Sequence, residues 1–161
     1  MRTESDIRRQ VERELTFTPF EVRIRDDVPM QGVSPGQNPD MVISLTFDGA
    51  RRDFSVETKS VSGMKNLRLA IMQAKAVAYA NQPLLPMVVM PYLRPEALDE
   101  LIAQKTSGID LCGNGVVYIP NVWFAYRTGA KNRYPSSAPI KSPFRGEQSI
   151  VARALLSGAT F

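Results

Sequence analysis

The 161-residue chain contains no histidine and a single cysteine, Cys112. The lack of histidine excludes Ser-His and Cys-His catalytic pairs and histidine-bound zinc, and one cysteine makes neither an internal disulfide nor a cysteine-built zinc site. Long apolar runs are also missing. The most apolar stretch, residues 84–90, is interrupted and flanked by prolines and is far shorter than the roughly 20 residues that span a bilayer. Any hydrolytic chemistry must therefore use carboxylates, lysine and a hard metal ion.

The composition is that of an ordinary globular protein, with 43% hydrophobic and 22% charged residues. A chain of this length suits one compact domain that buries roughly 70% of its unfolded surface. The first residues, 2–10, are polar and do not resemble a signal peptide. We therefore expect a cytoplasmic protein with no membrane partner.

An Asp48-Gly49 pair predicts a tight two-residue turn between two antiparallel strands. A hairpin folded about this pair sets each residue before the turn opposite the residue equally far after it. The apolar residues then fall on one face and the polar ones on the other. The predicted pairs are Phe47 with Ala50, Thr46 with Arg51, Ser44 with Asp53, Ile43 with Phe54, Val42 with Ser55 and Met41 with Val56.

Extending this ladder by one residue sets Asp40 opposite Glu57, with Lys59 on the same face. Two carboxylates directly opposite each other, with Cβ atoms about 5 Å apart, repel unless a cation lies between them. The pattern therefore predicts that a divalent metal ion sits between Asp40 and Glu57. The alternative is a surface hairpin on which Glu57 and Lys59 form a weak ion pair.

Hydrophobic periodicity and turn residues predict the remaining elements. The expected order is helix, three strands, helix, strand, helix, two strands. The predicted ranges are helices at 5–15, 64–80 and 94–105, strands at 20–25, 84–92, 109–112 and 116–119, and the hairpin at 40–60.

A helix followed by antiparallel strands with Pro39-Asp40 and Glu57-Thr58-Lys59, then a helix and a strand, resembles the restriction-endonuclease-like, or PD-(D/E)xK, nuclease superfamily. The resemblance covers roughly residues 5–92. It implies an α/β fold in which helices flank a mixed central sheet.

The resemblance also implies a metal site. Asp40 and Glu57 would bind Mg²⁺ or Mn²⁺ with the backbone carbonyl of Thr58, and Lys59 would orient or help deprotonate the attacking water. Hard oxygen ligands suit magnesium, and such a metal assists phosphodiester hydrolysis. Many relatives cut two strands as homodimers, so the resemblance leaves a homodimer open as well.

Four further residues have a functional and a structural interpretation. Gln73 is in line with Leu69 and Val77 on the helix after the hairpin, so its amide is expected on an apolar stripe that faces the sheet. It resembles a residue that many such nucleases place near the metal; the alternative is a glutamine at the helix edge that binds a loop carbonyl. Glu14 resembles an additional metal-side acid, and Glu12 competes for that role. Asp110 could approach the metal, although an aspartate before Gly113-Asn114-Gly115 more often caps backbone donors.

The C-terminal part of the chain is basic, since residues 121–161 hold six basic side chains and one acidic side chain. Such a segment attracts polyanions, and its aromatic residues could stack on bases. A solvated loop with a few arginines is the alternative. The candidate nucleic-acid-binding residues are Arg127, Lys131, Arg133, Lys141 and Arg145.

Three other stretches, residues 108–115, 132–135 and 142–146, resemble a group of uncharacterised bacterial proteins in which a nuclease-like domain precedes a winged-helix DNA-binding domain. We therefore expect a nuclease-like domain at 1–145 and a C-terminal helix within 146–161. Residues 150–156 resemble the first winged helix, so the chain is either a fragment of a longer protein or keeps this helix for packing.

The expected function is that of a metal-dependent nuclease, an endonuclease whose partner is nucleic acid and in particular DNA. Two alternatives remain. One is a module that keeps the nuclease fold and binds or regulates DNA without cleaving it. The other is a protein-interaction domain of a defence or toxin-antitoxin system that uses residues 120–144 as its contact surface.

Overall fold

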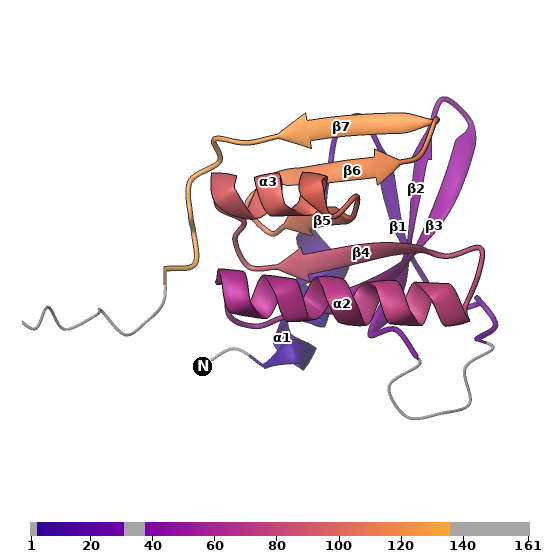
Figure 1. Ribbon diagram of the computed structural model, residues 1–161, viewed down its shortest axis with the longest axis horizontal. Coiled ribbons are helices and arrows are strands. Elements are labelled where there is room, and N and C mark those ends of the chain that lie inside the picture. Colours follow the sequence, from indigo (N-terminus) through magenta and orange to yellow (C-terminus); the bar gives the residue numbers. More distant parts are fainter. Residues whose placement is uncertain (1–2, 31–37, 136–161) are drawn as a thin grey trace, which may run out of the picture.

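The protein is an α/β protein whose curled, mixed sheet is covered by helices (Figure 1). The computed structural model describes residues 3–30 and 38–135. Within these ranges the elements are α1 (Glu4–Glu14), β1 (Glu21–Arg25), β2 (Met41–Phe47), β3 (Ala50–Thr58), α2 (Met64–Ala80), β4 (Leu85–Met90), α3 (Pro95–Ala103), β5 (Ser107–Asp110), β6 (Gly115–Ile119) and β7 (Trp123–Arg127).

The strands lie in the sheet in the order in which they occur in the chain, from β1 to β7. β1, β2 and β3 pair antiparallel, β3, β4 and β5 pair parallel, and β5, β6 and β7 pair antiparallel. The two parallel pairs need crossover connections, which α2 and α3 provide. Both helices lie on the same face of the sheet (Figure 1).

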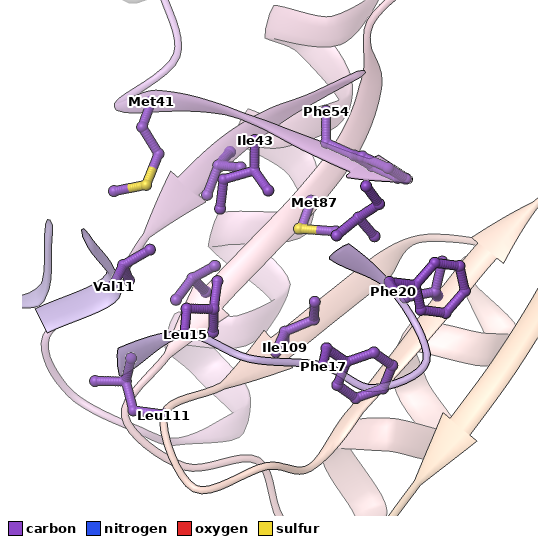
Figure 2. Packing of buried hydrophobic residues seen from close by; sticks show 14 of the residues in the cluster. Val11, Leu15, Phe17, Phe20, Met41, Ile43, Phe54, Met87, Ile109 and Leu111 are labelled. Carbon is purple, nitrogen blue, oxygen red and sulfur yellow. The ribbon is translucent and has the colours of Figure 1, made fainter. Parts of the chain in front are cut away.

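Each face of the sheet has its own apolar core. On one face, α1 contributes Ile7, Val11 and Leu15, which pack with strand residues such as Phe54 and Val56 (Figure 2). On the other face, α2 and α3 pack on a second cluster that includes Val88 and Met90. Alternate residues of the central strands therefore face different helices, as the period of two requires.

The sheet curls so that its two ends come together. The ring of Trp123 on β7 lies 5.2 Å from the ring of Phe20, just before β1, and 5.9 Å from that of Phe47 at the end of β2. Phe17 packs on the same inner face, where the ring leaves no room for a side chain at Gly115. α1 and this aromatic cluster fill the inside of the curl.

The predicted hairpin register is confirmed from Met41 opposite Val56 to Phe47 opposite Ala50. Asp48 and Gly49 have φ angles of 49° and 76°, the left-handed values that a two-residue hairpin turn of this type needs. The predicted bounds of α2 are also confirmed.

Two predictions about strands were wrong. The strand predicted at 109–112 is β5 and ends at Asp110, because the Asp110 side chain binds the turn that follows. β7 was not predicted, since the sequence of residues 123–127 was interpreted as a cationic aromatic segment. A Pro120-Asn121 turn, with φ of 58° at Asn121, joins β6 to β7.

Some predictions fall outside the described residues. The helix predicted within 146–161 is one of them, and Lys141 and Arg145 also lie outside the described residues. In the part of the chain that is described, none of the helices has the length and apolarity to cross a bilayer.

Candidate functional site

The end of β3 brings Glu57, Thr58 and Lys59 to one corner of the sheet. Glu57 pairs with Val88 of β4, which belongs to the cluster packed under α2 and α3. Glu57 therefore points to the face that α2 covers, whereas Thr58, next to it, points to the α1 face. The tripeptide thus presents side chains to both faces of the sheet.

Glu57 and Lys59 form an ion pair, with 2.7 Å between Lys59 Nζ and Glu57 Oε1. They lie two residues apart and share a face, as the sequence predicted. Only 12% of the Glu57 side chain and 15% of the Lys59 side chain are exposed. An ion pair so well buried is costly to break, because either charge alone would be left poorly solvated.

Asp40 is not opposite Glu57 in the ladder, contrary to the prediction. Strand pairing ends at Met41 and Val56, and the Asp40 N–H donates to the Val56 carbonyl at 3.0 Å. The physical reason is Pro39: it would have to pair with Thr58, and it has no N–H to donate. The ladder therefore stops one residue early.

The Asp40 side chain supplies the hydrogen-bond acceptor that the ladder lacks here. Its Oδ2 accepts the Thr58 N–H at 2.7 Å and the Thr58 hydroxyl at 2.9 Å. The N–H and C=O of a strand residue point to the same neighbouring strand, so the Thr58 carbonyl is also directed toward the side on which Asp40 lies. Asp40 and Thr58 hence supply oxygen atoms at the end of β3, and the Glu57 side chain lies next to them along the strand, on the face that α2 covers.

This set of donors fits a hard divalent cation. Two carboxylates and a backbone carbonyl are ligands that Mg²⁺ accepts, and water fills its other positions. Among residues 3–30 and 38–135, no three acidic, cysteine or histidine side chains gather to hold a metal. A metal here would rely on Asp40, Glu57 and Thr58, the residues named from the sequence.

Two buried polar atoms on the α2 side of the sheet have no hydrogen-bond partner in the described part of the chain: Gln73 Oε1 on α2 and Ser55 Oγ on β3. Such orphaned acceptors are rare and each costs free energy. Ser55 shares its face of β3 with Glu57 and was missed from the sequence, although the period of two indicates it.

Gln73 lies at the edge of the buried stripe of α2. The prediction that the line through Leu69 and Gln73 faces the sheet was wrong, since Leu69 is 43% exposed. The buried residues of the helix are Leu67, Ala70, Ile71, Ala74, Val77 and Ala78.

Glu12 and Glu14, the two candidate acids of α1, differ in their relation to Asp40. Glu12 forms an ion pair with Arg8 at 3.3 Å, and Arg8 also donates to the Asp40 carbonyl at 3.3 Å. Glu14 instead accepts from Gln10 at 3.2 Å. Through Arg8, Glu12 is the acid more closely linked to the corner.

Asp110 is a cap. Its Oδ1 accepts the backbone N–H groups of Cys112 and Asn114, both at 2.8 Å, and its Oδ2 accepts the Leu93 N–H at 2.8 Å and the Asn114 side-chain amide at 2.6 Å. The carboxylate is 1% exposed. The capping interpretation of the sequence describes these contacts. Cys112 is half-buried in the same turn.

Two of the candidate nucleic-acid-binding arginines hold the fold together. Arg127 donates to the Thr18 carbonyl at 2.6 Å and lies 5.2 Å from the Phe17 ring. Arg133 donates to the Leu111 carbonyl, and its hydrogen bond to Cys112, together with Tyr134, raises its pKa above the ordinary arginine value. Lys131, between them, is exposed.

Comparison with known protein families, with curated proteins and with solved structures gave no match. The geometry of the chain therefore carries the functional argument by itself. What it establishes directly is a mixed α/β protein with a curled sheet and a polar, partly buried corner at the end of β3.

Proposed function

We propose that the protein is a metal-dependent phosphodiester hydrolase that acts on nucleic acid, and in particular a DNA endonuclease of the restriction-endonuclease-like type. The observation that carries the proposal is the hydrogen-bonded corner in which Asp40 contacts Thr58 and Glu57 contacts Lys59. These are the residues whose order in the sequence resembles the nuclease motif.

The arrangement of the elements supports the same proposal. From α1 to β4, the chain forms a helix, three antiparallel strands, a helix and a strand parallel to β3. The resemblance implies this order, with antiparallel strands that bear the Pro-Asp and the Glu-x-Lys. Fold alone does not assign an activity, so the proposal depends on the chemistry of the corner.

Asp40, Glu57 and the Thr58 carbonyl are the groups that would hold Mg²⁺. When bound, the metal would make a water molecule more acidic and neutralise charge on a phosphate. Within the described residues, Asp40 uses only Oδ2 in its hydrogen bonds to Thr58, so Oδ1 is open to a cation. Lys59 lies against Glu57 and would hold the attacking water or a phosphate oxygen.

The contacts at the corner also favour a second candidate function, a nucleic-acid-binding module that does not cleave. Thr58 already donates to Asp40, and Lys59 already neutralises Glu57. Such a self-satisfied corner needs no metal for stability. A protein of this kind would bind nucleic acid in a salt-dependent manner without cutting it.

A cleavage assay separates the two. The full chain is incubated with labelled plasmid and with single- and double-stranded oligonucleotides in Mg²⁺, Mn²⁺ or EDTA. We expect cleavage with either metal, none with EDTA, and loss of at least two orders of magnitude in rate for Asp40→Asn and Glu57→Gln, because each change removes a ligand charge.

Asp99→Asn is the matched control, since Asp99 is an exposed acid on α3, away from the corner. Its rate should equal that of the unaltered protein. Folded protein that leaves every substrate intact in both metals would contradict the proposal. If that protein still bound DNA with affinity falling as salt rises, the second candidate would stand.

A further inference from the structure

Strand β7 lies at one edge of the sheet formed by the described residues, at the top of Figure 1, and it exposes apolar side chains. Phe124 is 59% exposed, Tyr126 42% and the preceding Val122 47%. Phe124 and Tyr126 lie two residues apart in the strand, so their side chains point to one face of it. Exposed aromatic residues on an edge strand invite pairing with another chain.

The backbone of β7 is open on the same edge. Tyr118 of β6 pairs with Phe124, and its backbone N–H and C=O both bond to the Ser107 hydroxyl of β5, at 2.9 and 3.3 Å. The N–H and C=O groups of Tyr118 therefore point away from β7. In an antiparallel ladder, the N–H and C=O groups of its partner, Phe124, then point away from β6. The N–H and C=O groups of Phe124 and Tyr126 hence point outward.

The opposite edge, β1, is protected by charge. Glu21 and Arg23 form an ion pair at 2.6 Å, and Arg25 pairs with Asp27 at 2.7 Å. The hydrogen bond from Arg25 lowers the pKa of Asp27 to about 2, so this pair stays ionised at ordinary pH. Charged side chains on an edge strand discourage pairing. From Trp123 to Tyr126, β7 carries no charge.

The aromatic face of β7 also lacks a cation for a phosphate backbone. Arg127 is the one basic residue of the strand, and it lies on the other face, where it donates to the Thr18 carbonyl and stacks on Phe17. A nucleic acid stacked on Phe124 and Tyr126 would find no basic group of β7 beside it. The face suits a neutral, apolar partner.

We propose that β7 pairs antiparallel with β7 of a second copy of this chain, about a twofold axis at Ala125. Phe124 then lies opposite Tyr126 of the second copy, and Trp123 lies opposite Arg127. The outward N–H and C=O groups of Phe124 and Tyr126 bond to each other across the axis. Like charges are nowhere opposed, and both aromatic pairs are cross-strand neighbours.

This register suits β7 better than a register shifted by one residue in either direction. Because the outward groups belong to Phe124 and Tyr126, an axis at Ala125 joins them as hydrogen-bonded pairs and lets all of β7 take part. The interface uses the same patch on both copies, as twofold dimers do. The two sheets become continuous, and the proposal does not depend on the metal site at β3.

The first test is the mass of the full chain in solution, measured by sedimentation from low to high micromolar protein. The proposal expects twice 17.9 kDa at high concentration. Phe124→Pro removes the outward N–H without touching a bond to β6, a position at which edge strands tolerate proline, and should give a monomer. Phe124→Thr removes the ring alone and should weaken the dimer roughly tenfold.

Circular dichroism and the melting temperature show whether both variants fold. A second test uses folded protein with the strand intact. Residues on the twofold axis form a close pair, with Cβ atoms about 5 Å apart, near the separation of a disulfide. Ala125→Cys should therefore oxidise to a covalent dimer. Tyr126→Cys is the control, because its copies lie opposite Phe124 and should remain uncrosslinked.

Three results would overturn the proposal. They are an unaltered protein that stays monomeric at every concentration, a dimer that is indifferent to Phe124→Pro, and an Ala125→Cys variant that does not crosslink faster than Tyr126→Cys. Hydrogen exchange tests the competing possibility, which is that nucleic acid binds this face of β7. If an oligonucleotide protects the Phe124 and Tyr126 amides of a monomer, the face belongs to nucleic acid and the dimer is wrong.

Discussion

The carboxylate of Asp40 accepts the backbone N–H of Thr58 at 2.7 Å, in the place where a carbonyl of β2 would stand if the hairpin continued. One side chain therefore replaces the missing backbone acceptor where the strand pairing ends and also brings negative charge to the end of β3, next to Glu57. Stability and proposed activity make different demands on Asp40, and substitutions can separate them.

Asp40→Ala should destabilise the protein by about 1–3 kcal/mol, because the N–H of Thr58, a residue only 1% exposed, loses its acceptor. Asp40→Asn should lose less, since an amide oxygen can still accept this bond. Urea unfolding curves followed by circular dichroism measure both. Cleavage, by contrast, should be lost in both variants, because neither keeps the ligand charge.

An Asp40→Asn variant as unstable as Asp40→Ala would mean that charge rather than the hydrogen bond holds Thr58. Equal cleavage rates for Asp40→Asn and the unaltered protein would show that Asp40 is not a metal ligand. Asp99→Ala provides the baseline for both measurements, because Asp99 is an exposed acid on α3.

Lys59→Met should destabilise the protein by about 3 kcal/mol, since it removes the ammonium group that lies 2.7 Å from the largely buried Glu57 carboxylate. Mg²⁺ should then restore part of the loss. At about 100 times its dissociation constant, a ligand that binds only the folded state adds about 2.7 kcal/mol. The measurement is the melting temperature with and without Mg²⁺.

The double variant Glu57→Gln, Lys59→Met tests the origin of that rescue. It removes both charges, so it should be more stable than Lys59→Met alone and should no longer respond to Mg²⁺. A Mg²⁺ response that survives the loss of Glu57 would show that the ion binds elsewhere on the chain.

The hairpin and α2 could be predicted from the sequence because local rules determine them. Asp48-Gly49 specifies a two-residue turn, and the alternation that follows fixes the register to Met41. The bounds of α2, Met64–Ala80, follow from the glycine before it and the proline shortly after it. Glu57 and Lys59 share a face for the same local reason.

The position of Asp40 and the existence of β7 could not be obtained in this way. A ladder extended by arithmetic ignores the missing N–H of Pro39, which moves the Asp40 side chain onto Thr58. β7 depends on a non-local contact, since Trp123 packs on Phe20 and Phe47 from the far end of the sheet. The contact of Trp123 with residues so distant in the chain leaves no local pattern.

Arg133→Ala should lower the stability of the protein by about 1–2 kcal/mol, because Arg133 donates to the Leu111 carbonyl and lies over the Tyr134 ring. Lys131→Ala, two residues earlier and exposed, should leave stability within about 0.5 kcal/mol. If DNA binds this segment, Lys131→Ala should reduce the salt dependence of binding by about one phosphate contact.

Chemical unfolding and DNA binding at several salt concentrations measure these effects. The prediction fails if Arg133→Ala is as stable as Lys131→Ala, which would mean that Arg133 is solvated and free to contact phosphates. Arg127→Ala should resemble Arg133→Ala, since Arg127 binds the Thr18 carbonyl.

Asp110→Ala should be among the most damaging single changes, at about 3 kcal/mol or more. The carboxylate of this 1% exposed residue accepts the N–H groups of Cys112 and Asn114 in the turn after β5 and that of Leu93 in the segment between β4 and α3. Asp110→Asn should cost nearly as much. Its oxygen can accept from Cys112, but its amide nitrogen then faces the Leu93 N–H, and two donors cannot pair. Denaturant unfolding of both variants against Asp99→Asn tests this. An Asp110→Asn variant of unaltered stability would show that the Leu93 N–H finds another acceptor.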